Sequence, residues 1–276
     1  MMLKTRQRYK SDNGLAYFKS GSGSPVVLIH GVGLRAEAWL NQEPVLSQHH
    51  TVYAIDMPGH GESDLLVKDD AGLDEYVDVI ADWINREIQA PVIMMGHSMG
   101  SMIALNFAIR YSELCVGVAA LNSVYRRSPQ AKQAVQQRAL DMLNSTALDN
   151  VTTPIIRWFN QNPQGLEKQM ADLCEQWLLA APVTGYARAY QIFSQNDGPE
   201  DDALMTLQIP AIFITGDGDT NSSGQMSERM ATLCPYGRYA VIENSRHMVQ
   251  MTHPDEINRL LAEFVQQCGT QIRSQA

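Results

Sequence analysis

The sequence has no long hydrophobic run, and this absence excludes a membrane-spanning helix. A helical span needs roughly 18 or more apolar residues in succession, and no stretch of the 276 residues approaches that length. The first residues, from Met1 to Arg8, are basic but lead into no apolar segment. We therefore expect no secretory signal and no membrane partner.

Cysteine is scarce and its spacing excludes a disulfide framework. The four cysteines lie far apart with no Cys-x-x-Cys pair, and no cluster of residues with metal-ligand spacing accompanies them. Scattered cysteines in a chain of this length are typical of buried free thiols in a reducing compartment. We therefore expect a cytoplasmic protein with no metal and no cofactor, in which the following residues stay unpaired: Cys115, Cys174, Cys234 and Cys268.

Positive charge is also sparse, which argues against a nucleic-acid partner. The net charge is −9, and the longest basic run is the pair Arg126-Arg127. Proteins that bind the phosphate backbone usually carry a basic patch. Hydrophobic residues make up 45% and charged residues 18%, as in ordinary globular proteins. The length suits one domain, or one domain with an insertion, and nothing in the sequence specifies an oligomeric state.

Short apolar runs alternate with helical patterns along the chain. Continuous rather than alternating apolar runs are typical of parallel strands that are buried on both faces. Strands that alternate with helices predict an α/β fold with a doubly wound, mostly parallel sheet. The predicted strands are Val26–Ile29, Thr51–Ile55, Val92–Met95, Val116–Leu121, Ala211–Ile214 and Arg238–Ile242. The predicted helices between them are Leu73–Ile88, Met99–Tyr111, Gln225–Leu233 and Pro254–Gln267.

Two segments depart from this alternation. Near the N-terminus, Lys4–Lys10 and Leu15–Lys19 flank an Asn-Gly turn, which predicts an antiparallel hairpin. Between Val124 and Leu207 no strand is predicted, and about 80 residues are too many for a simple connection. We interpret this interval as a helical lid over the carboxyl edge of the sheet, with helices at Gln130–Leu143, Val151–Asn160, Gly165–Leu179 and Gly185–Ser194.

A Gly-x-Ser-x-Gly element, Gly96-His97-Ser98-Met99-Gly100, directly follows the third buried strand. A serine hydroxyl is a weak nucleophile, and a tight strand-to-helix turn between small neighbours exposes its oxygen. The helix that follows supplies backbone N–H groups and a positive dipole end, which favour an oxyanion beside Ser98. The alternative is a turn that only caps a helix. Because a strand precedes and a helix follows, we identify Ser98 as the candidate nucleophile.

Together with two further motifs, this element makes the chain resemble the α/β-hydrolase superfamily over nearly its whole length. These motifs are His30-Gly31-Val32-Gly33 after the first buried strand and Asp56-Met57-Pro58-Gly59-His60-Gly61-Glu62-Ser63 after the second. The helical insertion also stands where members of the superfamily carry a cap. The resemblance implies an α/β-hydrolase fold with a core of residues 1–123 and 208–276 and a helical cap of residues 124–207.

The resemblance implies roles for four groups around the serine. The backbone N–H groups of Val32 and Met99 would form the oxyanion hole, and His30 would hold its own loop. The general base would follow the last strand, where His247 lies, although Arg246 stands where the superfamily usually has glycine. Two other histidines are alternatives. His97 adjoins the serine but is expected to point away, and His253 precedes a proline that marks a helix start.

Two aspartates compete for the third position of a Ser-His-Asp triad. Relatives place the acid three residues after a glycine that ends the preceding strand, and Gly216 places Asp219 there. Its role would be to hold the imidazole in one tautomer and stabilise the imidazolium. Asp217 is expected to bond the backbone of its own turn instead. The proline that commonly follows the acid is replaced by Thr220.

A serine at the turn excludes the aspartate-dependent haloalkane dehalogenases and epoxide hydrolases of this fold and favours acyl chemistry. Our first interpretation is a hydrolase of a small, partly apolar ester or lactone, which works through an acyl-enzyme without a cofactor. A hydrolase of C–C bonds in ring-cleavage diketones shares the triad and stays open, as does a non-catalytic receptor. Candidate substrate-binding residues of the lid and the histidine loop are Trp158, Trp177, Tyr186, Tyr190 and Met248.

Overall fold

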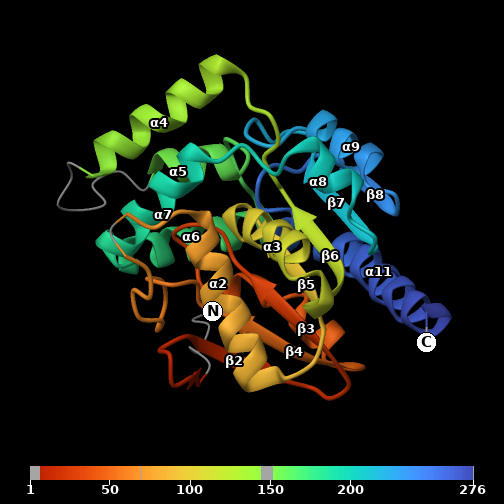
Figure 1. Cartoon of the computed structure of the whole chain (residues 1–276). Coiled ribbons are helices and arrows are strands. Elements are labelled where there is room, and N and C mark those ends of the chain that lie inside the picture. The colour runs from red at the N-terminus through yellow and green to blue at the C-terminus, as the bar shows by residue number, and fades with distance from the viewer. Residues whose placement is uncertain (1–6, 69, 144–151, 276) are drawn as a thin grey trace.

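The computed structural model describes residues 7–68, 70–143 and 152–275. Its strands form one sheet of eight strands in the order β1-β2-β4-β3-β5-β6-β7-β8. The strands from β4 to β8 in that order are parallel, whereas β1 and β2 are antiparallel to their neighbours. The strands are β1 (Tyr9–Lys10), β2 (Ala16–Ser20), β3 (Ser24–Ile29), β4 (His50–Ile55), β5 (Val92–His97), β6 (Cys115–Leu121), β7 (Ala211–Gly216) and β8 (Gly237–Ile242). The predicted mostly parallel sheet is confirmed (Figure 1).

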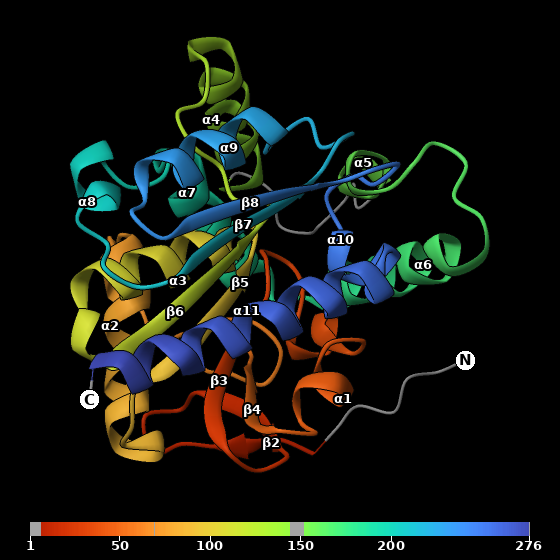
Figure 2. The same ribbon diagram turned by 90° about the vertical axis from the view of Figure 1, so that its right-hand side faces the viewer.

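Helices cover both faces of the sheet, as a doubly wound fold requires (Figure 2). One apolar cluster packs α2 (Leu73–Trp83) and α3 (Met99–Arg110) against the sheet, and the other packs α11 (Pro254–Gln275) against the opposite face. The remaining helices of the core are η1 (Ala36–Trp39), α1 (Glu43–Leu46), η2 (Ile84–Ile88), η3 (Ser112–Leu114), α9 (Gly224–Leu233) and α10 (Val249–Thr252). The strands β3, β5, β6 and β7 are almost wholly buried because their apolar side chains contact helices on both sides.

The last strand, β8, differs from the prediction in its surroundings. It lies at the edge of the sheet, and Arg238, Tyr239 and Val241 are exposed. The strand was predicted at the right place, but the expectation of burial on both faces is wrong. The reason is topological, because β8 has only β7 as a neighbour and α9 as a cover.

The N-terminal hairpin is confirmed for the residues that the structure describes. β1 pairs with β2 in the register Tyr9 to Tyr17, and the N–H of Gly14 donates to the carbonyl of Ser11 across the turn (2.8 Å). Gly14 has φ +86°, a conformation that glycine adopts without strain. The first part of the predicted Lys4–Lys10 segment lies outside the described residues.

Between β6 and β7 the described chain is helical, with no strand. The helices are α4 (Pro129–Leu143), α5 (Thr152–Trp158), α6 (Gly165–Ala180), α7 (Val183–Gln195) and the short α8 (Asp201–Met205). Four of them match the predicted helices within a few residues, and α8 was not predicted. Val151, the predicted start of α5, lies outside the described residues. In Figure 1 these helices lie above the carboxyl ends of the parallel strands.

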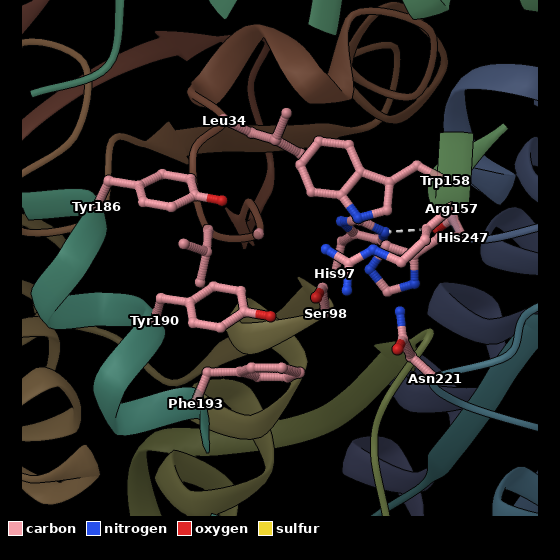
Figure 3. A pocket seen from close by; sticks show the side chains of 12 residues that line it. Leu34, His97, Ser98, Arg157, Trp158, Tyr186, Tyr190, Phe193, Asn221 and His247 are labelled. Atoms are coloured by element: carbon pink, nitrogen blue, oxygen red, sulfur yellow. Dashed lines mark hydrogen bonds between the residues drawn. The ribbon is translucent and has the colours of Figure 1, made fainter. Parts of the chain in front are cut away.

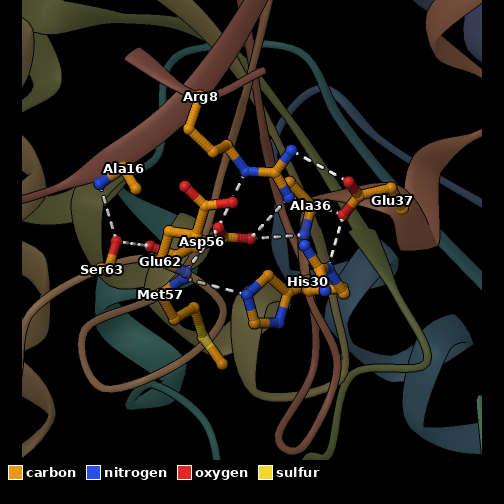
Figure 4. A network of polar contacts seen from close by, with 10 residues as sticks. Arg8, Ala16, His30, Ala36, Glu37, Asp56, Met57, Glu62 and Ser63 are labelled. Atoms are coloured by element: carbon orange, nitrogen blue, oxygen red, sulfur yellow. Dashed lines mark hydrogen bonds and ion pairs between the residues drawn. The ribbon is translucent and has the colours of Figure 1, made fainter. Parts of the chain in front are cut away.

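A buried ionic network fixes the loop that follows β4 (Figure 4). The carboxylate of Asp56 accepts hydrogen bonds from Arg8 Nε (2.9 Å), Ala36 N (2.8 Å) and Glu62 N (3.0 Å). Arg8 also pairs with Glu37. Burial opposes the charged form of Asp56, but Arg8 and the backbone donors hold its pKa below the ordinary value. The Asp-x-Pro-Gly motif is therefore a structural element that shapes the loop beside the oxyanion-loop motif.

Asp56→Asn is expected to destabilise the fold by about 3 kcal/mol, because it leaves the Arg8 guanidinium buried with one partner fewer and places an amide against backbone donors. Urea unfolding of both proteins measures the difference. Asp64→Asn is the matched control, since Asp64 forms an exposed pair with Lys10 and its loss is expected to cost less than about 1 kcal/mol. Equal losses for the two variants would contradict a structural role for the network.

Candidate active site

Ser98 occupies a strained turn between β5 and α3. Its backbone has φ 55° and ψ −122°, a region that residues with a side chain rarely adopt. Its N–H donates to Leu121 O at the end of β6 (2.8 Å), which ties the turn to the sheet edge. In the described part of the chain, the Ser98 hydroxyl makes no hydrogen bond of its own, so its oxygen is available to the pocket that it lines.

Two glycines make this turn possible. A Cβ on Gly96 would lie 2.0 Å from Gly100 O, and a Cβ on Gly100 would lie 2.3 Å from Ile29 O at the end of β3. Both contacts are with backbone atoms, which cannot move away as a side chain can. The Gly-x-Ser-x-Gly pattern is therefore required by the close packing of the turn against its own helix and the neighbouring strand.

His247 and Asp219 meet at the same edge of the sheet. Asp219 follows β7, His247 follows β8, and His247 Nδ1 lies 2.7 Å from Asp219 Oδ2. Both side chains are buried. Because the carboxylate only accepts, Nδ1 carries a proton in this pair, and Nε2 is the nitrogen that can accept a proton in the corresponding neutral tautomer. His247 and Ser98 line the same pocket (Figure 3).

Asp219 is held by more donors than the histidine alone. It accepts from Asn122 Nδ2 (2.8 Å), Ser222 Oγ (2.5 Å) and the N–H of Asn221 (2.8 Å). Burial opposes its charge, but the His247 ring and these donors hold its pKa well below the ordinary value. Asp219 is thus a charged carboxylate over the whole physiological range. The sequence reasoning missed Asn122 and Ser222, although Asn122 directly follows a predicted strand that ends at this edge.

Asp217 takes no part in the contact between Asp219 and His247. Its side chain is exposed, and its carboxylate accepts from the N–H of Ser245 (3.2 Å) in the loop that carries His247. The prediction that the Asp217 carboxylate bonds the backbone of its own turn is wrong. The loop after β8 lies close enough to supply the donor instead. Asp217 does not contact His247 in the structure, which leaves Asp219 as the acid beside the imidazole.

The two alternative histidines are engaged in other contacts. His97 lines the pocket, but its Nε2–H donates to His247 O (2.8 Å), a bond drawn in Figure 3. Burial lowers the pKa of His97 to about 3, which makes its ring a poor base. His253 ends α10, lies beside Thr252 Oγ1 (2.9 Å from Nδ1) and does not line the pocket.

The backbone groups expected to hold an oxyanion are unoccupied by protein acceptors. Neither Val32 N nor Met99 N donates to an acceptor among the described residues. The loop of Val32 passes directly over the serine, since a Cβ on Gly31 would lie 3.0 Å from Ser98 Cβ. Val32 and Met99 therefore stay the predicted oxyanion donors.

Two buried histidines fix this loop from below. His30 Nε2 accepts from Met57 N (2.9 Å), so the His30 ring holds its loop as predicted. His60 Nε2 accepts from Gly33 N (3.1 Å) and thus bonds the oxyanion loop itself. Burial lowers the pKa of His30 to about 3 and of His60 to about 4, so both rings are neutral acceptors.

These pKa values predict that acid destabilises the fold well above pH 4. In the unfolded chain the rings of His30, His60 and His97 titrate near pH 6.5, whereas in the folded chain they titrate near 3 to 4. Their contribution is therefore fully present above pH 6.5 and is lost as the pH falls, because only the unfolded chain takes up protons. The slope approaches about 1.4 kcal/mol per pH unit for each ring.

Urea unfolding at pH 7.5, 6.0 and 5.0 measures this dependence. His60→Gln keeps an acceptor for Gly33 N–H and is expected to reduce the slope between pH 6 and 5 by about a third. A stability that stays constant between pH 7.5 and 5.0 would show that the rings are not held neutral.

The inserted helices contribute four aromatic residues and one arginine to the twelve residues that line the pocket above Ser98. Trp158 of α5 and Tyr186 and Tyr190 of α7 line it as predicted. Trp177 and Met248 do not. Trp177 packs against the core from α6, and Met248 is fully buried because it begins α10 beneath the histidine loop. Phe193 of α7, an aromatic residue of the same inserted helices, lines the pocket as well. The sequence reasoning did not assign three further lining side chains to the site, which are Leu34, Arg157 and Asn221.

Candidate metal-ligating side chains are not clustered in the described residues. No group of three or more His, Cys, Asp or Glu side chains that could hold a metal occurs among them. The predicted free cysteines are confirmed, since all four are buried and unpaired. Over the same described ranges, no helix has both the length and the apolar character needed to cross a membrane.

Comparison with known proteins shows which family the chain belongs to. The profile of the alpha/beta hydrolase family matches residues 26–260. The (E)-2-((N-methylformamido)methylene)succinate hydrolase of Acinetobacter baylyi is 40% identical over 96% of this chain and 99% of its own length. A thermophilic esterase from Thermogutta terrifontis, solved with malate bound, superimposes with a TM-score of 0.84 at 25% identity, over 95% of this chain and 99% of the esterase.

An enol-lactonase from Burkholderia xenovorans shares the fold, with a TM-score of 0.81 at 19% identity over 91% of this chain and 96% of its own. The family match spans most of the chain, and the relative from Acinetobacter baylyi is similar along almost its entire length. The protein is therefore a hydrolase that belongs to the alpha/beta hydrolase family.

Proposed function

We propose that the protein is a serine hydrolase in which Ser98 is the nucleophile, His247 the general base and Asp219 the orienting acid. The observation that carries this proposal is the 2.7 Å hydrogen bond between His247 Nδ1 and Asp219 Oδ2 at the pocket of Ser98. It fixes the tautomer in which Nε2 can accept the serine proton. The missing Ser98–His247 hydrogen bond does not oppose this role, because such bonds often tighten only when substrate binds.

The reaction follows from these groups. Ser98 Oγ attacks a carbonyl carbon while His247 Nε2 takes its proton, and the N–H groups of Val32 and Met99 stabilise the oxyanion. Collapse breaks the acyl bond, and the leaving group departs with the proton from His247. Water, deprotonated by His247, then cleaves the acyl-enzyme and restores Ser98.

The similarity to the relative from Acinetobacter baylyi suggests which type of acyl bond this protein cleaves. The name of its substrate describes a succinate whose methylene carbon carries an N-methylformamide, which is an activated amide because the nitrogen is conjugated with a double bond. We place an activated amide of this kind first, ahead of the small esters and lactones predicted from the sequence. Attack on the formyl carbonyl would release the amine and then formate.

The cap predicted for residues 124–207 is part of this proposal. Residues of α5 and α7 supply the wall of the pocket opposite Ser98, and α5 contacts the histidine loop, since Trp158 O accepts from His247 N (3.2 Å). We propose that the inserted helices form a cap that excludes water and shapes a site for a small molecule, with residues 1–123 and 208–276 as the core.

A hydrolysis panel tests the proposal. (E)-2-((N-methylformamido)methylene)succinate, 4-nitrophenyl butyrate, a small lactone and a dienone diketone are incubated with the protein, and the products are measured by liquid chromatography. We expect stoichiometric formate from the first compound. Turnover of the ester or lactone alone would overturn the choice of amide, and cleavage of the diketone alone would favour C–C hydrolysis. If no compound is cleaved by folded protein, the serine hydrolase proposal fails.

A further inference from the structure

The pocket of Ser98 contains an arginine that has no hydrogen-bond or ion-pair partner among the residues that the structure describes. Arg157, at the C-terminal end of α5, lines the pocket (Figure 3). Its Nε is buried without a hydrogen-bond partner, and the guanidinium makes no ion pair within the described part of the chain. The lining residues include no Asp or Glu. In a protein of net charge −9, this is a local excess of positive charge at the site.

Two other arginines with buried side chains are fully engaged, unlike Arg157. Arg127, near the start of α4, pairs with Asp197 (2.8 Å), donates to two backbone carbonyls and lies over the Phe193 ring. Arg8, beside the loop after β4, is held by Asp56 and Glu37. A buried donor is costly without an acceptor. The buried Nε of Arg157, which no described residue bonds, therefore indicates a ligand as its partner.

The position of Arg157 is fixed relative to the candidate base. Its neighbour Trp158 accepts a hydrogen bond from His247 N (3.2 Å), and the Trp158 ring stacks on the His247 ring at 6.1 Å between centroids and 26° between planes. Arg246 in the same loop donates to Ile156 O (3.5 Å). The last turn of α5 is therefore anchored to the histidine loop, and a group bound by Arg157 would be held at a set distance from Ser98.

Tyr190 of α7 adds a second donor on the other side of the pocket. Its oxygen accepts from Arg138 Nε (3.1 Å), so its own hydroxyl proton stays free to donate to a ligand. Figure 3 shows the hydroxyls of Tyr186 and Tyr190 on the side of their rings that faces Ser98. Burial raises the pKa of Tyr186, while Arg157 and Arg138 act in the opposite direction, which places both cations near this ring.

We propose that Arg157 binds a carboxylate of the substrate, with the Tyr190 hydroxyl as a second donor, so that the site selects small acyl compounds bearing a carboxylate. The planar guanidinium matches a carboxylate in a two-bond arrangement, and a charge-assisted pair in a shielded pocket strongly discriminates against a neutral analogue. The inference rests on the proposed function, since it specifies the substrate class of the same site. Arg157 would set specificity, whereas Ser98 and His247 would carry out the reaction.

Two formate esters of equal chain length test this assignment. Butyl formate and 4-formyloxybutanoate carry the formyl group of the proposed substrate and differ by a methyl group against a carboxylate at the end of the leaving group. We expect the wild-type protein to prefer 4-formyloxybutanoate in kcat/KM, measured by formate release. Arg157→Gln is expected to lower kcat/KM for 4-formyloxybutanoate about thirtyfold more than that for butyl formate, mainly through KM. Arg157→Lys is expected to recover part of this loss, because it restores the charge but not the planar fork.

Control experiments distinguish a wrong assignment of Arg157 from a wrong proposed function. Arg86→Gln removes an exposed arginine that pairs with Asp82 on α2 and is expected to leave both values unchanged. Succinate is expected to inhibit butyl formate hydrolysis by the wild-type protein competitively, while succinamide does not, and this readout needs no variant. Equal losses for both esters in Arg157→Gln, or equal inhibition by succinate and succinamide, would overturn the assignment. Failure to hydrolyse either ester and to react at Ser98 would instead count against the proposed function.

Discussion

Asp219→Asn is expected to lower kcat by up to about 10⁴-fold while leaving the fold intact. The aspartate holds the proton of His247 on Nδ1 through a 2.7 Å hydrogen bond. An amide in its place can donate to Nδ1, which would move the proton to Nε2 and leave no acceptor for the serine. The effect should fall on kcat more than on KM, because Asp219 lies behind the histidine and away from the pocket. Steady-state kinetics on any ester that the protein cleaves measures it.

The matched control for this change is Asp217→Asn. Asp217 is exposed, and among the described residues its carboxylate accepts one hydrogen bond, from Ser245 N (3.2 Å), so its replacement is expected to change kcat by less than about threefold. A larger loss in Asp217→Asn than in Asp219→Asn would reassign the acid. Circular dichroism of both variants shows whether a lost activity reflects misfolding.

Ser98→Ala is expected to lower kcat by about 10⁶-fold, the largest effect of any single change. The variant loses the nucleophile but keeps the backbone donors of the oxyanion hole, so a weak residual catalysis should remain. The substitution is not expected to relieve the backbone strain at this position, because alanine is as disfavoured as serine at φ 55°. Ser227→Ala is the matched control, since Ser227 is a buried serine of α9 whose hydroxyl bonds no other residue in the described part of the chain. Comparable losses in the two variants would contradict the role of Ser98.

Much of the site could be predicted because it lies where parallel strands end. Ser98 was identified from five adjacent residues and their flanking strand and helix, and the structure confirms that strand-turn-helix arrangement. Asp219 was separated from Asp217 by spacing, and the hydrogen bond to His247 agrees with that choice. Asn122 could have been found in the same way, as a polar residue that directly follows the strand ending at Leu121.

The pocket residues from the inserted helices could not be predicted in the same way. The apolar periodicity of a helix shows which face is buried, but not whether that face meets the core or the substrate. Trp177 and Tyr186 look alike in this respect and both pack in the core cluster, yet only Tyr186 also lines the pocket. No sequence pattern predicts a binding role for Arg157, because that role is inferred from the absence of a partner among the described residues. Its position at the pocket is set by the packing of α5 against the histidine loop, which the sequence does not show.

The central claim is that His247 and Asp219 activate Ser98, and covalent labelling tests it most directly. The folded protein is treated with a fluorophosphonate, which phosphonylates activated serines, and the modified peptide is identified by mass spectrometry. We predict one adduct, on Ser98, that forms in the wild-type protein and in Asp217→Asn but forms much more slowly in Asp219→Asn. An adduct on another serine, or no adduct on protein shown to be folded, would contradict the account.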